Sequence, residues 1–551
     1  RRAGRPAHGV ELGGWYSRDN GNIFGQVLSA LARAYAVTED DALRDKVAAL
    51  VGEWGRCLGP DGYGFYAQPT GVVYTFDKLV GGLVDTYLYA AVDEARPLLA
   101  RFVDWGIRNL DRTRLYANAD GEGAANVAGA EWYTLPENLY RAFLATGDQK
   151  YRDFAEIWEY PEFWNQIAAG ADIFAPRPDG RTPTYHAYSH ANSFSSAAAA
   201  YLVTHDRRYL DVLRAAFDFL WKQTFATGGY GPRELLLPPA RLPAMLAESK
   251  YHYETQCGTW AAFKLCKYLL QFTGDARCGD WIERLLYNAV LASLPITDDG
   301  RVFYYSSYQL DGGFKEHYDD GWACCAGTYP LVSTDLHDLI YLRPAAEGDG
   351  GLYVNLYVPA TVDWQSGDTF VSLAQHTRFP EDDTVDFSIF AARAVRFALR
   401  LRVPGWLAGP LRVEINGEPW PADAALRTVS SAPADAQRWL TIDRKWTSAD
   451  TLSVQFPQRL AAQPLLPDKP LGDPSLPPPG NPAALTRGPV VLAIRAPEAP
   501  PHGRIHLADL DHELLPADAE PLTYHVRNEP ELLVRPFYAF RAKEPYFMYL
   551  H

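Results

Sequence analysis

The sequence is poor in several features that mark particular classes of protein. Its 551 residues include only six cysteines, too few and too scattered for the disulfide framework of a small secreted domain. No stretch approaches the roughly 18 uninterrupted apolar residues of a membrane-spanning helix. Positive charge is in deficit, since 52 Lys and Arg face 67 Asp and Glu, for a net charge of −15. We therefore expect neither a membrane nor a nucleic acid as partner.

The composition is that of a large globular protein. Hydrophobic residues make up 47% and charged residues 22% of a chain long enough for two or three domains. Aromatic residues make up 13%, which suits both carbohydrate recognition and ordinary core packing. The chain opens Arg1-Arg2-Ala3 without a methionine, and we expect the natural start to lie upstream. The compartment, cytoplasmic or periplasmic, and the oligomeric state stay open.

The first 345 residues have the pattern of repeated helical hairpins. Apolar residues recur at helical spacing over residues 22–37 and again over 42–58. A polar turn follows many of the predicted helices and carries an Asp placed to cap the next one. It occurs at residues 37–43, 145–151, 203–209 and 272–278, with a degenerate copy near 91–94. The repeat predicts an array that closes into an (α/α)₆ barrel over residues 1–345.

The hydrophobic period changes to two after about Gly351. Strand patterns occupy residues 352–358, 395–403 and 452–456, and Asn416-Gly417 is a hairpin-turn signal. We predict a β-sandwich over residues 346–460, and a second sandwich or a continuation of the first over 461–551. The fold class is therefore α+β and multidomain, with the barrel first.

Three short segments concentrate reactive side chains: residues 227–234, 251–258 and 321–327. Between them they supply one carboxylate and three thiols, a plausible tetrahedral set for Zn²⁺. These residues are Glu254, Cys257, Cys324 and Cys325. The same cysteines would also suit inert positions in a buried core, and the residues alone leave both interpretations open.

Further polar and aromatic residues are candidates for contacts with a sugar. His186 and His190 lie four residues apart, without the intervening Glu of a zinc-protease motif. Glu131 heads a predicted inner helix, where the alternative is a solvated helix start. Tyr318 and Trp322 precede the cysteine pair, and Trp322 would floor a pocket there.

The three segments together resemble glycoside hydrolase family 127. The order is Gly-Gly-x-Gly…Glu, then Glu-x-x-Cys, then Trp-x-Cys-Cys, followed by Gly-Leu-Tyr-Val-Asn-Leu-Tyr; Tyr287-Asn288 and Arg487-Gly488-Pro489-Val490 extend the likeness. The resemblance implies an (α/α)₆ barrel followed by β-sandwich domains. It also implies a retaining glycosidase with a cysteine nucleophile, and members of the family include β-L-arabinofuranosidases.

The resemblance also implies a role for each residue of the motifs. By position, Cys324 corresponds to the nucleophile and Glu234 to the general acid/base. Cys257 and Cys325 correspond to zinc-bound thiolates and Glu254 to the carboxylate ligand, so Zn²⁺ is the expected cofactor. A thiol that binds Zn²⁺ loses its proton, which would leave Cys324 ready to attack an anomeric carbon.

The sequence departs from the family pattern in two places that matter for function. Gln256 is inserted between Glu254 and Cys257, where many relatives have Glu-Thr-Cys. Asp77-Lys78 replaces a His-Lys pair of relatives, which makes Asp77 a substrate-contact candidate and leaves the sugar open.

We expect an oligosaccharide or polysaccharide substrate from plants or algae, with terminal β-L-arabinofuranose the best single choice. The same machinery would also suit 3,6-anhydro-galactose or a branched acidic sugar. Two other classes are a polysaccharide lyase, and a non-catalytic carbohydrate-binding protein stapled by zinc.

Overall fold

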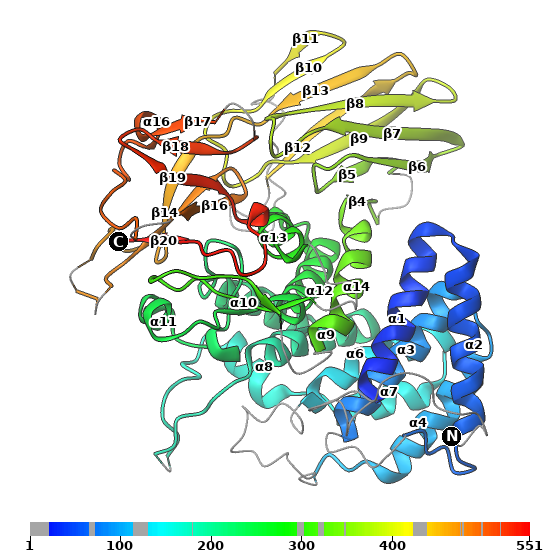
Figure 1. The fold of residues 1–551 in the computed structure, drawn as a ribbon. Coiled ribbons are helices and arrows are strands. Elements are labelled where there is room, and N and C mark those ends of the chain that lie inside the picture. Colours follow the sequence, from blue (N-terminus) through cyan, green and yellow to red (C-terminus); the bar gives the residue numbers. More distant parts are fainter. Residues whose placement is uncertain are drawn as a thin grey trace.

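A computed structural model gives the fold of most of the chain. It describes residues 21–65, 72–113, 131–178, 180–294, 302–317, 324–345, 349–421, 438–473, 475–476, 479–496, 500–517 and 520–551. Helices make up the first part of the chain and strands most of the second, and the two parts pack against one another (Figure 1). The predicted fold class is confirmed.

Six inner helices form a closed ring, because each packs against the next and the last packs against the first. These are α1 (Gly21–Thr38), α3 (Val72–Ala90), α6 (Leu135–Thr146), α9 (Ala187–Thr204), α12 (Thr255–Thr273) and α14 (Cys324–Asp335). The described residues of this part also form α2 (Asp41–Cys57), α4 (Ala95–Asn109), α7 (Gln149–Ile157), α8 (Pro161–Ala168), α10 (Arg207–Trp221), α11 (Leu242–Glu248) and α13 (Ala276–Leu285). Helix α9 is buried from Ala187 to Ala200, as an inner helix of a barrel must be.

The repeated turn forms the same hydrogen-bonded device four times. In the first copy Asp40 accepts from the backbone N–H of Ala42, and the Asp40 N–H donates to the hydroxyl of Thr38. Asp148, Asp206 and Asp275 cap α7, α10 and α13 in the same way. Glu94, in the degenerate copy, makes no such cap. The predicted Asp caps are confirmed.

Short elements lie between the longer helices and strands. They are the 3₁₀ turns η2 (Glu131–Thr134), η3 (Pro232–Glu234), η4 (Pro239–Arg241), η6 (Leu291–Ser293), η7 (His337–Leu339) and η8 (Phe537–Ala539), and the π-helical turn η5 (Leu286–Val290). A small antiparallel sheet joins β1 (Tyr253–Glu254), β2 (Phe303–Ser306) and β3 (Glu316–His317). Its register pairs Glu254 with Tyr305, and β1 runs directly into α12.

Two sheets follow the ring. The six-stranded sheet has the order β11 (Glu418–Trp420), β10 (Arg412–Ile415), β13 (Thr451–Gln455), β8 (Thr384–Ala391), β7 (Thr369–Thr377) and β6 (Ala360–Ser366). The four-stranded sheet has the order β12 (Trp439–Trp446), β9 (Val395–Arg402), β5 (Leu352–Val354) and β4 (Tyr341–Leu342). Asn416 and Gly417 have positive φ angles of 56° and 80° between β10 and β11, so the predicted hairpin turn is confirmed.

A third sheet ends the chain. Its order is β14 (Leu460–Pro464), β15 (Ala483–Arg487), β16 (Val490–Arg495), β19 (Glu529–Pro536), β18 (Tyr524–Val526) and β17 (Leu514–Pro516), with β20 (Tyr549–Leu550) paired to β15. The short helix α16 (Leu510–Glu513) precedes β17. The domain limits at 345 and 460 stay predictions.

The third sheet is hydrogen-bonded to the helical part. Asn288, in the π-helical turn, donates to the carbonyl of Pro489 and accepts from the N–H of Val491, both at 2.8 Å. The Tyr549 hydroxyl accepts from the backbone N–H of Ala226 at 2.8 Å, and the Tyr546 hydroxyl donates to the carbonyl of Ser307. The C-terminal sheet therefore supports the loops of the barrel.

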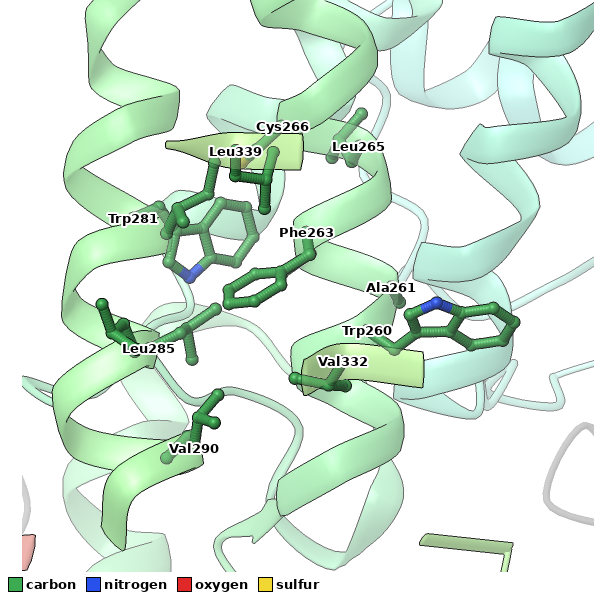
Figure 2. Close-up of a cluster of buried hydrophobic side chains, with 14 of the residues drawn as sticks. Trp260, Ala261, Phe263, Leu265, Cys266, Trp281, Leu285, Val290, Val332 and Leu339 are labelled. Carbon is green, nitrogen blue, oxygen red and sulfur yellow. The ribbon is translucent and has the colours of Figure 1, made fainter. Parts of the chain in front are cut away.

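An apolar core fills the space between α12, α13 and α14. Figure 2 shows Cys266 of α12 among these apolar side chains, near Leu265 and Leu339. Cys266 and Cys278 are both fully buried. Among the helices of the described residues, none has the length and apolar character needed to cross a bilayer.

Candidate active site

The three reactive segments meet at the N-terminal ends of α12 and α14. Glu254 is the last residue of β1, Cys257 lies in the first turn of α12, and Cys324 and Cys325 begin α14. One ligand atom from each of these four buried residues lies within 4.8 Å of the others. The inserted Gln256 points elsewhere, since its amide donates to the hydroxyl of Ser293. The extra residue therefore leaves the Glu254–Cys257 pair on one side of the helix start.

The separations within this cluster fit a tetrahedral zinc site. Zn–S bonds of about 2.3 Å and Zn–O bonds of about 2.0 Å put two sulfur ligands about 3.8 Å apart, and a sulfur and an oxygen about 3.5 Å apart. The Sγ atoms of Cys257 and Cys325 are 3.8 Å apart, and Cys324 Sγ lies 3.4 Å from Glu254 Oε1. The donor set fits the expected metal in geometry and in chemical type.

The electrostatics of the cluster also favour a cation. Burial raises the pKa of Glu254 well above its ordinary value, and the neighbouring Cys324 and Glu234 raise it further. Burial likewise raises the pKa of the Cys257 thiol, and its contacts with Cys324 and Cys325 add to the effect. A divalent cation among these groups would reverse both shifts.

A second layer of polar residues holds the thiols in place. The hydroxyl of Thr328 lies 3.3 Å from Cys257 Sγ and donates to the carbonyl of Cys324. Gln26 of α1 in turn donates to the Thr328 hydroxyl at 3.1 Å. A Cβ on Gly327 would lie 2.3 Å from the Gln26 side-chain oxygen, so any other residue there would displace the Gln26 amide. The first and last helices of the ring thus orient the cluster together.

Glu234 lies at the end of the glycine-rich loop, in an unusual backbone conformation. Arg233 and Glu234 have φ angles of 55° and 61°, in the left-handed region that residues with a Cβ rarely adopt. The loop packs tightly, because a Cβ on Gly229 would lie 2.6 Å from the Tyr253 ring. Strained backbone of this kind is concentrated at functional sites.

Both oxygens of Glu234 accept hydrogen bonds. Tyr305 donates its hydroxyl to Oε1, and His186 Nε2 lies 3.2 Å from Oε2. His186 Nδ1 accepts from the backbone N–H of Ser189, so the neutral ring carries its proton on Nε2 and donates to Glu234. Burial alone would raise the pKa of Glu234, but the hydrogen bond from His186, the positive charge of that ring when protonated and the hydrogen bond from Tyr305 lower it below its ordinary value.

His186 connects the two halves of the site. Its Nε2 atom lies 3.7 Å from Glu254 Oε2 as well as 3.2 Å from Glu234 Oε2. A continuous series of contacts therefore runs from Cys324 through Glu254 and His186 to Glu234. The predicted metal and acid residues are thus close together.

Glu131 presents a buried carboxylate oxygen without a hydrogen-bond partner among the described residues. Its Oε2 atom is inaccessible to solvent, and the residue is 1% exposed. Burial raises the pKa of Glu131 to about 7, with Lys78 and His186 acting in the opposite direction. An unpaired buried acceptor is costly unless a ligand satisfies it, so Glu131 is a candidate partner for a hydroxyl group.

Two other sequence candidates are engaged by protein groups. Asp77 accepts from Lys78, Thr134 and Asn138. His190 Nδ1 donates to the carbonyl of His186 at 2.9 Å, and its ring packs against four aromatic rings, those of Tyr133, Tyr160, Phe163 and Tyr185. Burial lowers the pKa of His190 to about 3, which keeps the ring neutral. Tyr318 and Trp322 lie outside the described residues.

The sequence analysis missed Tyr304 and Tyr305. Besides the Tyr305 contact with Glu234, the Tyr304 hydroxyl lies 3.7 Å from Cys324 Sγ. The only signal in the sequence is a short apolar and aromatic run, 302–306, which is typical of a strand. Nothing local in that run indicates that it pairs with Glu254.

Comparisons with known proteins agree with this geometry. Residues 1–335 match a family model described as "Beta-L-arabinofuranosidase, GH127 catalytic domain", and residues 351–458 match the GH127 middle domain. A non-reducing end β-L-arabinofuranosidase of Bifidobacterium longum is 26% identical over 184 residues. That match covers 30% of this chain and 27% of the relative's length.

Solved structures share the fold across the whole chain. A GH127 β-L-arabinofuranosidase of Geobacillus stearothermophilus T6 superposes with a TM-score of 0.69 at 18% identity, covering 100% of this chain and 92% of that one. A second GH127 β-arabinofuranosidase gives a TM-score of 0.70 at 18% identity, covering 100% and 90%. Because the matched catalytic-domain model spans more than half of the residues, this chain belongs to glycoside hydrolase family 127.

Proposed function

We propose that this protein is a retaining exo-glycosidase that releases terminal β-L-arabinofuranose, or a closely related neutral sugar, from plant or algal glycans. The observation that carries the proposal is the series of contacts from Cys324 to Glu234. It puts a thiol nucleophile and a carboxylic acid at one site, as two-step glycoside hydrolysis requires.

In the first step, Cys324 Sγ would attack the anomeric carbon while the bond to the leaving oxygen breaks. The protonated form of Glu234 gives its proton to that oxygen, and a thioglycosyl-enzyme forms. The hydrogen bonds from His186 and Tyr305 stabilise the carboxylate that Glu234 becomes as it loses the proton. Both hydrogen bonds therefore act on the Glu234 oxygens, which gain negative charge in this step.

In the second step, the Glu234 carboxylate takes a proton from water, and the water oxygen attacks the anomeric carbon. The C–S bond breaks and the sulfur of Cys324 leaves as thiolate, so two displacements give net retention. Glu254, Cys257, Cys324 and Cys325 would hold Zn²⁺. When bound, the ion supplies the positive charge that keeps the thiols deprotonated near neutral pH.

The carboxylates around the site support a neutral sugar. Glu131, Glu234 and Glu254 are all acidic, whereas the ammonium group of Lys78 is paired with Asp77 at 3.1 Å. A sugar carboxylate would meet like charges here, which disfavours the branched acidic sugars. Hydroxyl groups, by contrast, would satisfy the free oxygen of Glu131.

The test is a panel of p-nitrophenyl furanosides and pyranosides, assayed with the wild type, Cys324→Ala and Cys266→Ala. We expect turnover of the β-L-arabinofuranoside, its loss in Cys324→Ala, and its retention in Cys266→Ala. NMR of the first-formed product should show the β anomer. Activity that survives Cys324→Ala would favour a lyase, and binding without turnover would favour a carbohydrate-binding protein.

A further inference from the structure

Solvent exposure rises steadily along one path out of the site. The side chain of Glu254 is 5% exposed and that of Glu234 is 19% exposed. Tyr305 is half-buried, and Tyr251 is 39% exposed. Tyr305 contacts both Glu234 and Tyr251, so these residues lead from the acid toward the surface.

Tyr251 is exposed, but its backbone and its ring are both held in place. Its carbonyl accepts from the N–H of Arg233 at 2.8 Å, beside the acid residue, and its own N–H donates to the Ser249 hydroxyl at 3.0 Å. Its ring packs against that of Tyr305, with centroids 4.4 Å apart and an angle of 41°. Because the Tyr251 ring is already held, the stacking of a ligand on it would cost that side chain little additional conformational entropy.

Tyr305 joins this aromatic surface to the catalytic acid. Its hydroxyl donates to Glu234 Oε1, and the β1–β2 register places it opposite Glu254. Polar groups lie next to Tyr251 as well. The Lys250 ammonium lies 5.3 Å from the Tyr251 ring centroid and 3.7 Å from Glu316 Oε2.

The chemistry of the reaction defines what lies on this path. The acid must face the oxygen of the leaving group, so the rest of that group lies on the outer side of Glu234. A sugar ring has an apolar C–H face that packs on an aromatic ring, and hydroxyl groups at its edge that suit Lys250 and Glu316. The exposed Tyr251 ring and the polar groups of Lys250 and Glu316 beside it match both requirements.

We propose that Tyr251 and Tyr305 form a subsite for the leaving group, and that its occupant is the sugar ring from which the terminal residue is cleaved. This inference rests on the proposed function, because it takes Glu234 as the acid. It assigns the enzyme to glycan chains in preference to small alkyl glycosides.

The test compares two substrates with the same terminal sugar, a methyl glycoside and a disaccharide. Tyr251→Ala should lower kcat/KM for the disaccharide about 3- to 10-fold more than for the methyl glycoside, mainly through KM. Tyr251→Phe keeps the ring and should restore most of the kcat/KM for the disaccharide that Tyr251→Ala loses. Phe370→Ala removes an aromatic side chain of the same 39% exposure from β7 of the six-stranded sheet, and should change neither substrate's kcat/KM.

Every other outcome would overturn the subsite, and one of them would overturn the proposed function as well. An equal loss for both substrates in Tyr251→Ala would show a structural role and overturn the subsite, as would no loss for either. A wild type that cleaves the methyl glycoside but shows no preference for the disaccharide overturns the subsite and leaves the proposed function intact. A wild type that cleaves no glycoside overturns both.

Discussion

Two of the buried polar centres among the inner helices differ in their balance of charge. The first is the Glu254–cysteine cluster, whose members are all acidic. The second joins Arg33 to Asp85 and Asp335, and Arg141 to Asp85. Helix α14 contributes to both, with Cys324 at its start and Asp335 at its end. Two arginines facing two aspartates need no ligand, whereas four acidic groups together call for a cation.

Removal of metal should have the largest effect, because it acts on the Glu254–cysteine cluster, whose acidic groups have no basic partner among its members. Dialysis of the wild type against a chelator should abolish turnover and lower Tm, and added Zn²⁺ should restore both. Elemental analysis should find about one zinc per chain in the wild type and much less in Cys257→Ala. A fully active protein with no bound metal would refute the assignment.

Breaking the balanced centre should affect stability and leave the chemistry intact. Asp85→Asn leaves Arg33 and Arg141 without their shared carboxylate and should cost about 3–5 kcal/mol of unfolding free energy. Urea titration gives the value, and kcat of the folded fraction should match the wild type.

The matched control is Asp104→Asn, which removes a 44% exposed partner of Lys150 and should cost less than about 1 kcal/mol. Equal costs for the two variants would contradict the distinction between buried and exposed pairs.

Tyr305→Phe should produce a smaller, substrate-dependent effect at the site. It removes a hydrogen bond to the Glu234 carboxylate but keeps the aromatic ring. Glycosides with poor leaving groups need the acid most, and their kcat should fall about 10- to 100-fold. Glycosides with a dinitrophenyl leaving group should be nearly unaffected, and a uniform loss across leaving groups would argue against this role.

A fall in pH should weaken the Arg33–Asp85–Arg141 centre, and this loss of unfolding free energy should be the smallest of the effects. Burial opposes ionisation of Asp85, but Arg141 and Arg33 lower its pKa from 3.8 to about 2. A depressed pKa in the folded state gives stability that is complete above about pH 4 and is lost as the pH falls toward 2. The stability gap between wild type and Asp85→Asn should therefore narrow by about 2 kcal/mol over that interval, as measured by urea titration.

Local patterns in the sequence were sufficient to predict much of the fold. The Thr-x-Asp turns and Asn416-Gly417 act through hydrogen bonds and backbone angles within a few residues, so the sequence alone identifies them. The residues alone left a metal site and an inert buried core both open for the cysteines, and the resemblance to glycoside hydrolase family 127 implied the metal site. The structure brings its four members together.

Contacts between distant segments were beyond such patterns. Tyr305 contacts Glu234 although the two are 71 residues apart, and the strand pairing that positions Tyr305 has no signal in the neighbouring sequence. His186 and His190 look equivalent in the sequence, but one contacts Glu234 and the other packs among aromatic rings. Only the packing of the helix distinguishes them.

The hydrogen bond between Tyr549 and Ala226 has a consequence for biosynthesis. The two residues are 323 positions apart, and the Ala226 end lies in the loop that leads to Glu234. During translation the barrel helices leave the ribosome long before the strand that backs this loop. Nascent chains that end before Tyr549 should therefore lack the final support of the acid loop, and catalytic competence should appear late in synthesis, after most of the secondary structure has formed.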